Sequence, residues 1–344
     1  MGNAASACNG ERCSQCKAAL GCCGKTTPCP ECSRSLCSGC LSHPVVTEAA
    51  QQSCQGEVRD QDIVAFCKGC FQKLSSLDFS KHVDVFEAVG GGGAITLVYV
   101  HGGGGSREMF KPHARAMAAK NFRCVLMDLP GHGARMDEEL TMDSALQAIV
   151  QVIREYAPPS ASGTKPIYIG GSLGGYVGME LLGKFPDLVS MAIITMCGQN
   201  VGVGRGAAAS MGLWAFETIL PRLGSRKIMS ALIGEIRKNG HLPEEAMMEC
   251  SFRPGMFFGQ AMAQVQILKA SDPSAALGKF PGPILFVNGS KDHRDSEHLW
   301  VEKSQKGQLI VYEGADHFFS HDDRHSKRFE EDCYNFIKQH AAIS

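Results

Sequence analysis

A serine between small residues is the first feature of this sequence that could do chemistry. Ser172 stands in the run G-G-S-L-G over residues 170–174, after an apolar stretch and before a helical pattern. This G-x-S-x-G pattern is typical of a sharp turn from a strand into a helix, which exposes the serine hydroxyl and leaves no room for neighbouring side chains. The start of a helix beneath the turn favours developing negative charge. The pattern therefore predicts that Ser172 is a nucleophile.

An acid and a base follow later in the chain, each after an apolar run. Asp292 ends a G-x-x-D turn, and Asp295 is the alternative acid. His317 follows the next apolar run, and His321 is a rival base four residues on. A histidine can take the proton of a serine hydroxyl, and a carboxylate can hold the imidazole in the tautomer that this requires. The order Ser172, Asp292, His317 thus predicts a catalytic triad.

Consecutive glycines form a third feature. His101 precedes the glycines at residues 102–105, at the end of the apolar run 95–100. Glycines let backbone N–H groups approach a substrate oxygen, as an oxyanion hole requires. A phosphate-binding loop is the competing interpretation, but the G-K-[ST] ending of a nucleotide loop is absent.

These segments need a framework that brings them together, and short apolar runs alternating with helical patterns supply one. Such alternation predicts a mostly parallel sheet with helices on both faces. The expected strands are residues 83–89, 95–100, 122–128, 166–169, 190–195, 283–287 and 308–312, and the expected helices are residues 142–156, 173–184 and 326–340.

With these motifs in this order, residues 81–344 resemble the α/β-hydrolase superfamily. The resemblance implies an α/β-hydrolase fold, with oxyanion donors at Gly103 N–H, or alternatively Gly102 N–H, and at Leu173 N–H. It also implies a structural role for the D-x-x-G-H-G turn at residues 128–133 and a helical cap at about 198–274. Because little sequence precedes the glycine-bearing strand, the first strands of the family's sheet are expected to be lost or supplied differently. Methionines and aromatic residues in the cap segment fit either an adaptable acyl pocket or the cap's own core.

The first part of the chain has a different chemistry, because twelve of the 16 cysteines lie in the first 70 residues. No apolar run typical of a signal peptide precedes them, so a reducing compartment favours metal thiolates over disulfides. Four C-x-x-C pairs supply eight thiolates, enough for two tetrahedral zinc ions that stabilise a segment with little core. The predicted ligands are Cys13, Cys16, Cys29, Cys32, Cys37, Cys40, Cys67 and Cys70.

The spacing of these pairs resembles the FYVE zinc finger, a cross-brace module, over residues 13–75. In that family the first and third pairs share one ion, and the second and fourth share the other. The family's basic segment before the second pair is replaced here by residues 25–30, K-T-T-P-C-P. We therefore carry over the fold and not the binding of a phosphoinositide.

The extreme N-terminus, residues 1–12, carries a lipidation pattern. Gly2 and Ser6 fit the N-myristoylation motif, and Cys8 is a candidate for S-acylation. Two acyl chains anchor a protein at a membrane, whereas one does so only marginally.

Composition limits the remaining possibilities. At 344 residues with 44% hydrophobic residues, the chain can bury a full core, and 34 basic against 35 acidic residues give no basic field for nucleic acid. We expect a cytoplasmic serine hydrolase of lipid-like carboxylic esters, peripheral at the plasma or an endosomal membrane. The alternatives are a protein acyl-thioesterase, a peptidase, or a membrane-tethered adaptor without catalysis.

Overall fold

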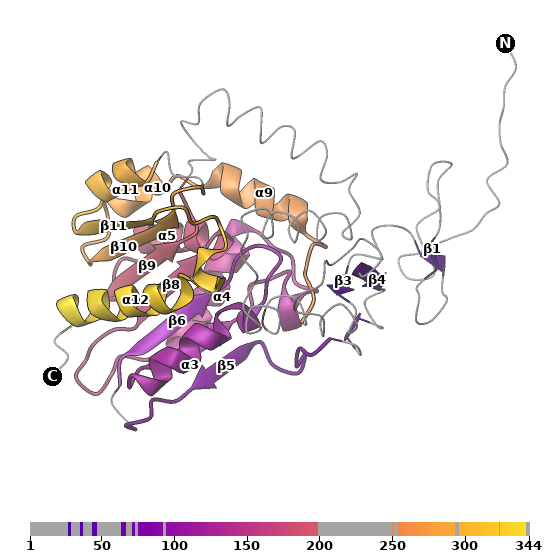
Figure 1. Cartoon of the computed structure of the whole chain (residues 1–344), viewed down its shortest axis with the longest axis horizontal. Coiled ribbons are helices and arrows are strands. Elements are labelled where there is room, and N and C mark those ends of the chain that lie inside the picture. Colours follow the sequence, from indigo (N-terminus) through magenta and orange to yellow (C-terminus); the bar gives the residue numbers. More distant parts are fainter. Residues whose placement is uncertain are drawn as a thin grey trace, which may run out of the picture.

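The computed structural model describes residues 71–72, 75–91, 94–198, 250, 254–292, 296–322 and 324–341, together with short strands nearer the N-terminus (Figure 1). Those strands form two antiparallel pairs, β1 (Thr27–Pro28) with β2 (Ser35–Leu36), and β3 (His43–Val46) with β4 (Ile63–Phe66). The eight predicted zinc ligands, the lipidation sites Gly2 and Cys8, and most of the predicted cap lie outside the described residues.

A seven-stranded sheet organises the rest of the chain, in the order β11-β10-β9-β8-β6-β7-β5. Neighbouring strands pair in parallel except β5, which runs antiparallel to β7 at the edge. Its strands are β5 (Val83–Phe86), β6 (Thr96–Val100), β7 (Arg123–Met127), β8 (Ile167–Gly171), β9 (Met191–Thr195), β10 (Ile284–Gly289) and β11 (Gly307–Tyr312). The expected mostly parallel sheet is confirmed, and one antiparallel strand precedes the glycine-bearing strand β6.

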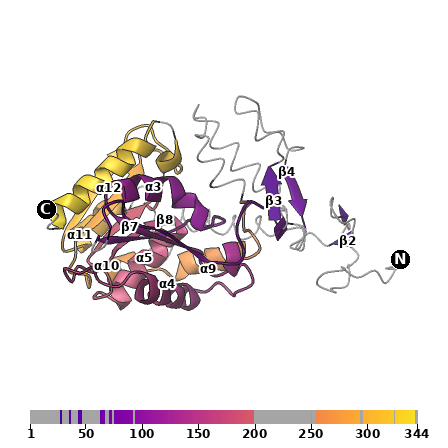
Figure 2. The ribbon, with the colours of Figure 1, turned by 90° about the horizontal axis from the view of Figure 1, so that it is seen from below.

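Helices cover both faces of the sheet, which explains why its central strands are apolar throughout. In β6, Leu97 and Tyr99 enter one core cluster while Val98 and Val100 enter the other. Figure 2 shows α3 and α12 on one side of the strands and α4, α5 and α10 on the other. The helices are α3 (Lys111–Ala119), α4 (Met142–Tyr156), α5 (Leu173–Lys184), α9 (Ala261–Ala270), α10 (Pro273–Leu277), α11 (Glu297–Lys303) and α12 (Ser326–His340).

The strand expected at residues 83–89 is shorter than predicted. It ends at Phe86 because the chain turns directly afterwards, with Gly91 N–H bonded to Ala88 O and Gly91 at φ +84°. Val89 is consequently 79% exposed. The short helices α3, α9, α10 and α11 were not predicted, because each spans too few turns to give a clear periodic pattern.

Residues just before β5 pack against the segment that precedes α9. Phe71 and Leu77 are buried in a small apolar cluster with Phe257. The carbonyl oxygen of Asp78 accepts a hydrogen bond of 2.7 Å from the Arg107 guanidinium. The packed unit around the sheet therefore includes residues upstream of 81. Within the described residues, no helix is long and apolar enough to cross a membrane.

Candidate active site

Ser172 lies at the turn between β8 and α5, in a backbone conformation that few residues adopt. Its φ is +50° and its ψ is −116°, and its N–H donates to Thr195 O at 2.9 Å. A Cβ on Gly170 would collide with Gly174 O, and one on Gly174 would collide with Val100 O. These contacts are the physical reason for the small residues of the motif. Strained backbone of this kind clusters at functional sites.

Asp292 and His317 are joined at the ends of β10 and β11. His317 Nδ1 lies 2.8 Å from Asp292 Oδ2, and the Asp292 side chain is only 3% exposed. The carboxylate accepts the Nδ1 proton, which leaves Nε2 with a lone pair. Burial lowers the pKa of His317, but the negative charge of Asp292 and its hydrogen bond outweigh burial, so the pKa is raised above 6.5.

The two loops that carry Asp292 and His317 are bonded to each other through the backbone. Ser290 N–H donates to Tyr312 O, and Lys291 N–H donates to Ala315 O, both at 2.9 Å. Since β8, β10 and β11 are parallel, the loop of Ser172 emerges at the same edge of the sheet. No hydrogen bond joins Ser172 Oγ to His317 in these described loops, and such bonds are often long in the absence of substrate.

The glycines at residues 102–105, which we call the glycine loop, lie against Ser172. A Cβ on Gly102 would stand 3.2 Å from Ser172 Cβ. The Gly102 N–H points to Met109 Sδ at 3.4 Å, and the Gly105 N–H donates to Gly102 O at 3.2 Å. Among the described residues, the Gly103 N–H has no acceptor. This arrangement favours Gly103 over Gly102 as an oxyanion donor.

Two buried histidines hold the glycine loop. His101 Nε2 accepts from Leu129 N–H at 3.1 Å, so its proton is on Nδ1, which donates to Gly102 O at 2.7 Å. His132 Nε2 accepts from Gly104 N–H at 3.1 Å, and its Nδ1 lies 3.0 Å from Pro130 O. Burial lowers the pKa of His101 to about 4 and that of His132 to about 3. Both imidazoles are therefore neutral at pH 7.

The glycine loop is also approached by α9 and the residues before it. The Gln264 amide nitrogen lies 3.0 Å from His132 Nε2, and a Cβ on Gly103 would collide with Gln264 Oε1. A Cβ on Gly104 would stand 2.7 Å from Phe258 and 3.3 Å from Met256. The glycine loop thus faces both an amide and apolar side chains.

Arg107 is a buried residue that sequence analysis missed. Its guanidinium bonds Asp128 at 2.6 Å and Asp84 at 3.1 Å, and its own N–H donates to Asp128 Oδ1 at 2.7 Å. Asp128 Oδ2 also accepts from Ala134 N–H at 2.9 Å. The D-x-x-G-H-G turn is thereby tied to the segment after the glycine loop. No motif marks Arg107, because its partners lie far away in sequence.

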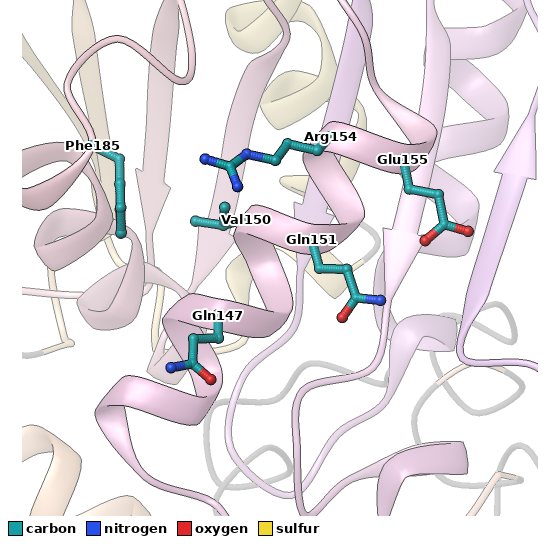
Figure 3. A pocket seen from close by; sticks show the side chains of 6 residues that line it. All are labelled: Gln147, Val150, Gln151, Arg154, Glu155 and Phe185. Atoms are coloured by element: carbon teal, nitrogen blue, oxygen red, sulfur yellow. The ribbon is translucent and has the colours of Figure 1, made fainter.

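The rival residues are not placed by the structure. Asp295 and the side chain of His321 lie outside the described residues. Within the described ranges, no group of three or more His, Cys, Asp or Glu could hold a metal ion. A hollow on the outside of α4 contains no serine, cysteine or histidine, so it offers no nucleophile (Figure 3). It is lined by Gln147, Val150, Gln151, Arg154, Glu155 and Phe185.

Comparison with known proteins agrees with this geometry. Residues 97–331 match the model of the alpha/beta hydrolase family. The chain belongs to this family. It is 26% identical over 262 residues to the pimeloyl-[acyl-carrier protein] methyl ester esterase of Xanthomonas oryzae, covering 72% of this chain and 97% of the relative. It is 24% identical over 254 residues to the sn-1-specific diacylglycerol lipase ABHD11 of Xenopus laevis, covering 70% and 79%.

Solved structures show the same fold as this hydrolase. The enol-lactonase of Burkholderia xenovorans superposes with a TM-score of 0.59 at 15% identity, over 75% of this chain and 96% of that one. The monoacylglycerol lipase of Paleococcus ferrophilus gives a TM-score of 0.54 at 15% identity, over 76% and 99%. The alpha/beta hydrolase fold is therefore confirmed, and the protein is a hydrolase enzyme.

Proposed function

We propose that this hydrolase cleaves carboxylic esters with Ser172 as nucleophile, His317 as general base and Asp292 as the orienting acid. The observation that carries the proposal is the 2.8 Å bond between His317 and Asp292, at the sheet edge where Ser172 emerges. Ser172 Oγ attacks the acyl carbon while His317 Nε2 takes its proton. The negative oxygen that forms accepts hydrogen bonds from Gly103 N–H and Leu173 N–H.

The reaction then completes in two steps. The tetrahedral intermediate collapses, and the leaving alkoxide takes the proton from His317 Nε2. A water molecule attacks the acyl-enzyme, giving one proton to His317, and the second collapse returns that proton to Ser172 Oγ and releases the acid. Leu173 opens α5, where the first N–H groups of a helix have no partner within the helix and favour negative charge.

The substrate class is supported by the walls of the site and by the relatives. Phe258 and Met256 lie against the glycine loop and present apolar surface to an acyl chain. The two curated relatives are named for the cleavage of a methyl ester and of a diacylglycerol, both of which are carboxylic esters. We therefore favour lipid-like esters over thioesters and peptides.

Turnover of p-nitrophenyl esters of increasing acyl length tests this function. We expect Ser172→Ala to abolish turnover and labelling by a fluorophosphonate, and the wild type to prefer medium or long acyl chains. His317→Ala should lose activity by roughly a thousandfold or more. Activity in Ser172→Ala close to that of the wild type would refute the mechanism. A wild type that binds esters without hydrolysing them would favour a non-catalytic adaptor.

We also propose that the N-terminal part holds the hydrolase at a membrane. The support is the sequence pattern alone, with Gly2 and Cys8 as the acylated residues and the FYVE-like zinc module between them and the hydrolase. Fractionation of cells tests this membrane attachment. Gly2→Ala should release the protein into the cytosol, and Cys8→Ser should release most of it. Retention of Gly2→Ala on membranes would instead indicate binding of lipid by the zinc module.

A further inference from the structure

The segment before α9 holds the glycine loop from outside. We call residues 254–258 the strap. Phe257 N–H in the strap donates to Gly104 O at 2.9 Å, while Gly104 N–H is held by His132 at 3.1 Å. Gly104 is thus bonded on both its amide and its carbonyl. Because Gly104 adopts φ +75°, this pair of bonds fixes a conformation that the glycine would otherwise exchange for others.

The strap is itself held by residues that precede the sheet. We call these residues the N-terminal brace: Phe71, Ser75 and Leu77. They contact Phe257 and Pro254 in the strap. The rings of Phe71 and Phe257 meet edge to face at 5.5 Å, and Ser75 Oγ donates to Pro254 O at 2.6 Å. Phe71 is completely buried, and Phe257 is 1% exposed.

This contact is separate from the main cores. Phe257 belongs to a small cluster with Phe71 and Leu77, joined by Phe79 and Met136, and to neither of the two large clusters around the sheet. Within the described residues, Phe257 therefore packs with Phe71 and Leu77 of the brace. On its other side the Phe257 ring approaches the His132 ring, with centroids 6.5 Å apart. The two partners of Gly104 are the Phe257 N–H and His132 Nε2, so both belong to Phe257 or to the ring beside it.

We propose that Phe71 is a positioning residue for ester hydrolysis, acting through Phe257 and Gly104 on the Gly103 N–H that binds the oxyanion. The inference rests on the proposed function, since it assumes an oxyanion at the glycine loop. An oxyanion donor works only when it is held in place before the reaction, and removal of one donor costs about a hundred- to a thousandfold in kcat. A displaced donor costs less than one that is removed, and a shift of about 1 Å is worth up to about a hundredfold.

The test compares two buried phenylalanines in the full-length chain. Phe71→Leu loosens the brace, and Phe280→Leu makes the same change in the large core near the opposite end of the sheet. A fluorophosphonate titrates intact active sites in each preparation, and kcat is expressed per titrated site on a p-nitrophenyl ester. Affinity for a boronic acid that mimics the tetrahedral intermediate is measured alongside KM.

We expect Phe71→Leu to lower kcat per site roughly ten- to a hundredfold and to weaken boronate binding in parallel, with KM within about twofold. Phe280→Leu should keep both values within about twofold of the wild type. Ser75→Ala removes two hydrogen bonds, one to Pro254 O and one from Leu77 N–H, and leaves no large cavity. It therefore tests the brace even where Phe71→Leu folds poorly, and it should also lower kcat per site.

Two results would overturn the inference. One is a kcat per site in Phe71→Leu and Ser75→Ala equal to that of Phe280→Leu, which would make the brace merely structural. The other is a loss confined to KM, which would place the brace in substrate binding. Loss of turnover in Ser172→Ala, measured in the same assay, keeps either result distinct from a failure of the proposed function.

Discussion

Gly174 determines whether the turn at Ser172 can form, because it lies against backbone and not against movable side chains. A Cβ there would meet the backbone carbonyl oxygens of Val100, the last residue of β6, and of His101, which follows it. Neither can move aside as the end of a flexible side chain could. Gly174→Ala should therefore cost about 3 kcal/mol or more in the free energy of unfolding and lower esterase activity. Urea denaturation measures the first quantity.

Gly278→Ala is the matched control for this change. Gly278 has φ −63°, and Lys303 O would lie 3.6 Å from a Cβ there, which is an ordinary van der Waals distance. The substitution should change stability by less than about 0.5 kcal/mol. Equal stability of the two variants would contradict the tight approach at the turn.

In the proposed mechanism, the protonation of His317 determines the acid limb of the pH–activity profile. The base must be neutral to accept a proton, and Asp292 raises the pKa of His317 above 6.5. We expect kcat/KM to fall about tenfold per pH unit below that raised pKa. Asp292→Asn should shift the limb to lower pH and reduce activity by roughly ten-thousandfold at neutral pH.

Asp316→Asn is the control, because the charge of Asp316 contributes least to the raised pKa of His317. Its acid limb should stay close to that of the wild type. An unchanged limb in Asp292→Asn would assign the titration to another group.

At the scale of the elements, Arg107 joins the edge strand β5 to the end of β7. Its side chain is fully buried between Asp84 and Asp128. Arg107→Met leaves the buried Asp128 carboxylate without its cation, whereas Asp84 keeps Lys81 at 2.7 Å. We therefore expect a loss of about 3–5 kcal/mol in unfolding free energy, mainly from Asp128.

Lys184→Met breaks an exposed pair with Asp143 instead, and it should cost less than about 1 kcal/mol. Adding Asp128→Asn to Arg107→Met should recover part of the loss, because the buried charge is removed. A double-mutant cycle measures this coupling, and strict additivity would argue against the pair as the source of the effect.

The histidines of the loops around Ser172 make the fold sensitive to acid. Burial lowers the pKa of His101 to about 4 and of His132 to about 3, whereas an unfolded histidine titrates near 6.5. Between pH 7 and 5 the unfolded chain binds more protons than the folded one, so stability falls as pH falls. The expected loss is about 2 kcal/mol for each histidine over this interval.

Urea unfolding at pH 5 and at pH 7 gives this loss, and His132→Gln should reduce it by about 2 kcal/mol. Taking the difference between variant and wild type cancels the contributions of other titrating groups. A pH dependence that is identical in the two proteins would mean that His132 has the same pKa in the folded state as in the unfolded chain.

At the scale of the whole molecule, the cysteine pairs predict two zinc ions per chain within residues 13–70. Metal analysis of protein purified without chelator should find both. Cys29→Ser should lower the zinc content. Cys54→Ser changes a cysteine outside the pairs, so this variant should retain two zinc ions per chain. Less than one zinc per chain in the wild type would contradict the cross-brace assignment.

The sequence predicted best what is encoded locally. Helices α4 and α12 have the expected bounds because their apolar residues recur at helical spacing over about four turns. Helix α5 begins where expected because the glycines around Ser172 require a sharp turn there. Arg107, Gln264 and Phe71 could not be predicted in the same way. Each acquires its role from a partner distant in the chain, as Gln264 does from His132, and single residues of these types carry no signal.

The N-terminal brace has a consequence for the evolution of such fused chains. The composition changes near residue 81, which makes that point look like a natural boundary for exchanging one module for another. A recombination there would separate Phe71 and Ser75 from the strap that they hold. The segment that must stay together with the hydrolase therefore begins no later than Phe71. Phe71 is one residue after the last cysteine of the predicted zinc module. We therefore expect a chimera joined at residue 81 to lose activity, and one joined upstream of Phe71 to keep it.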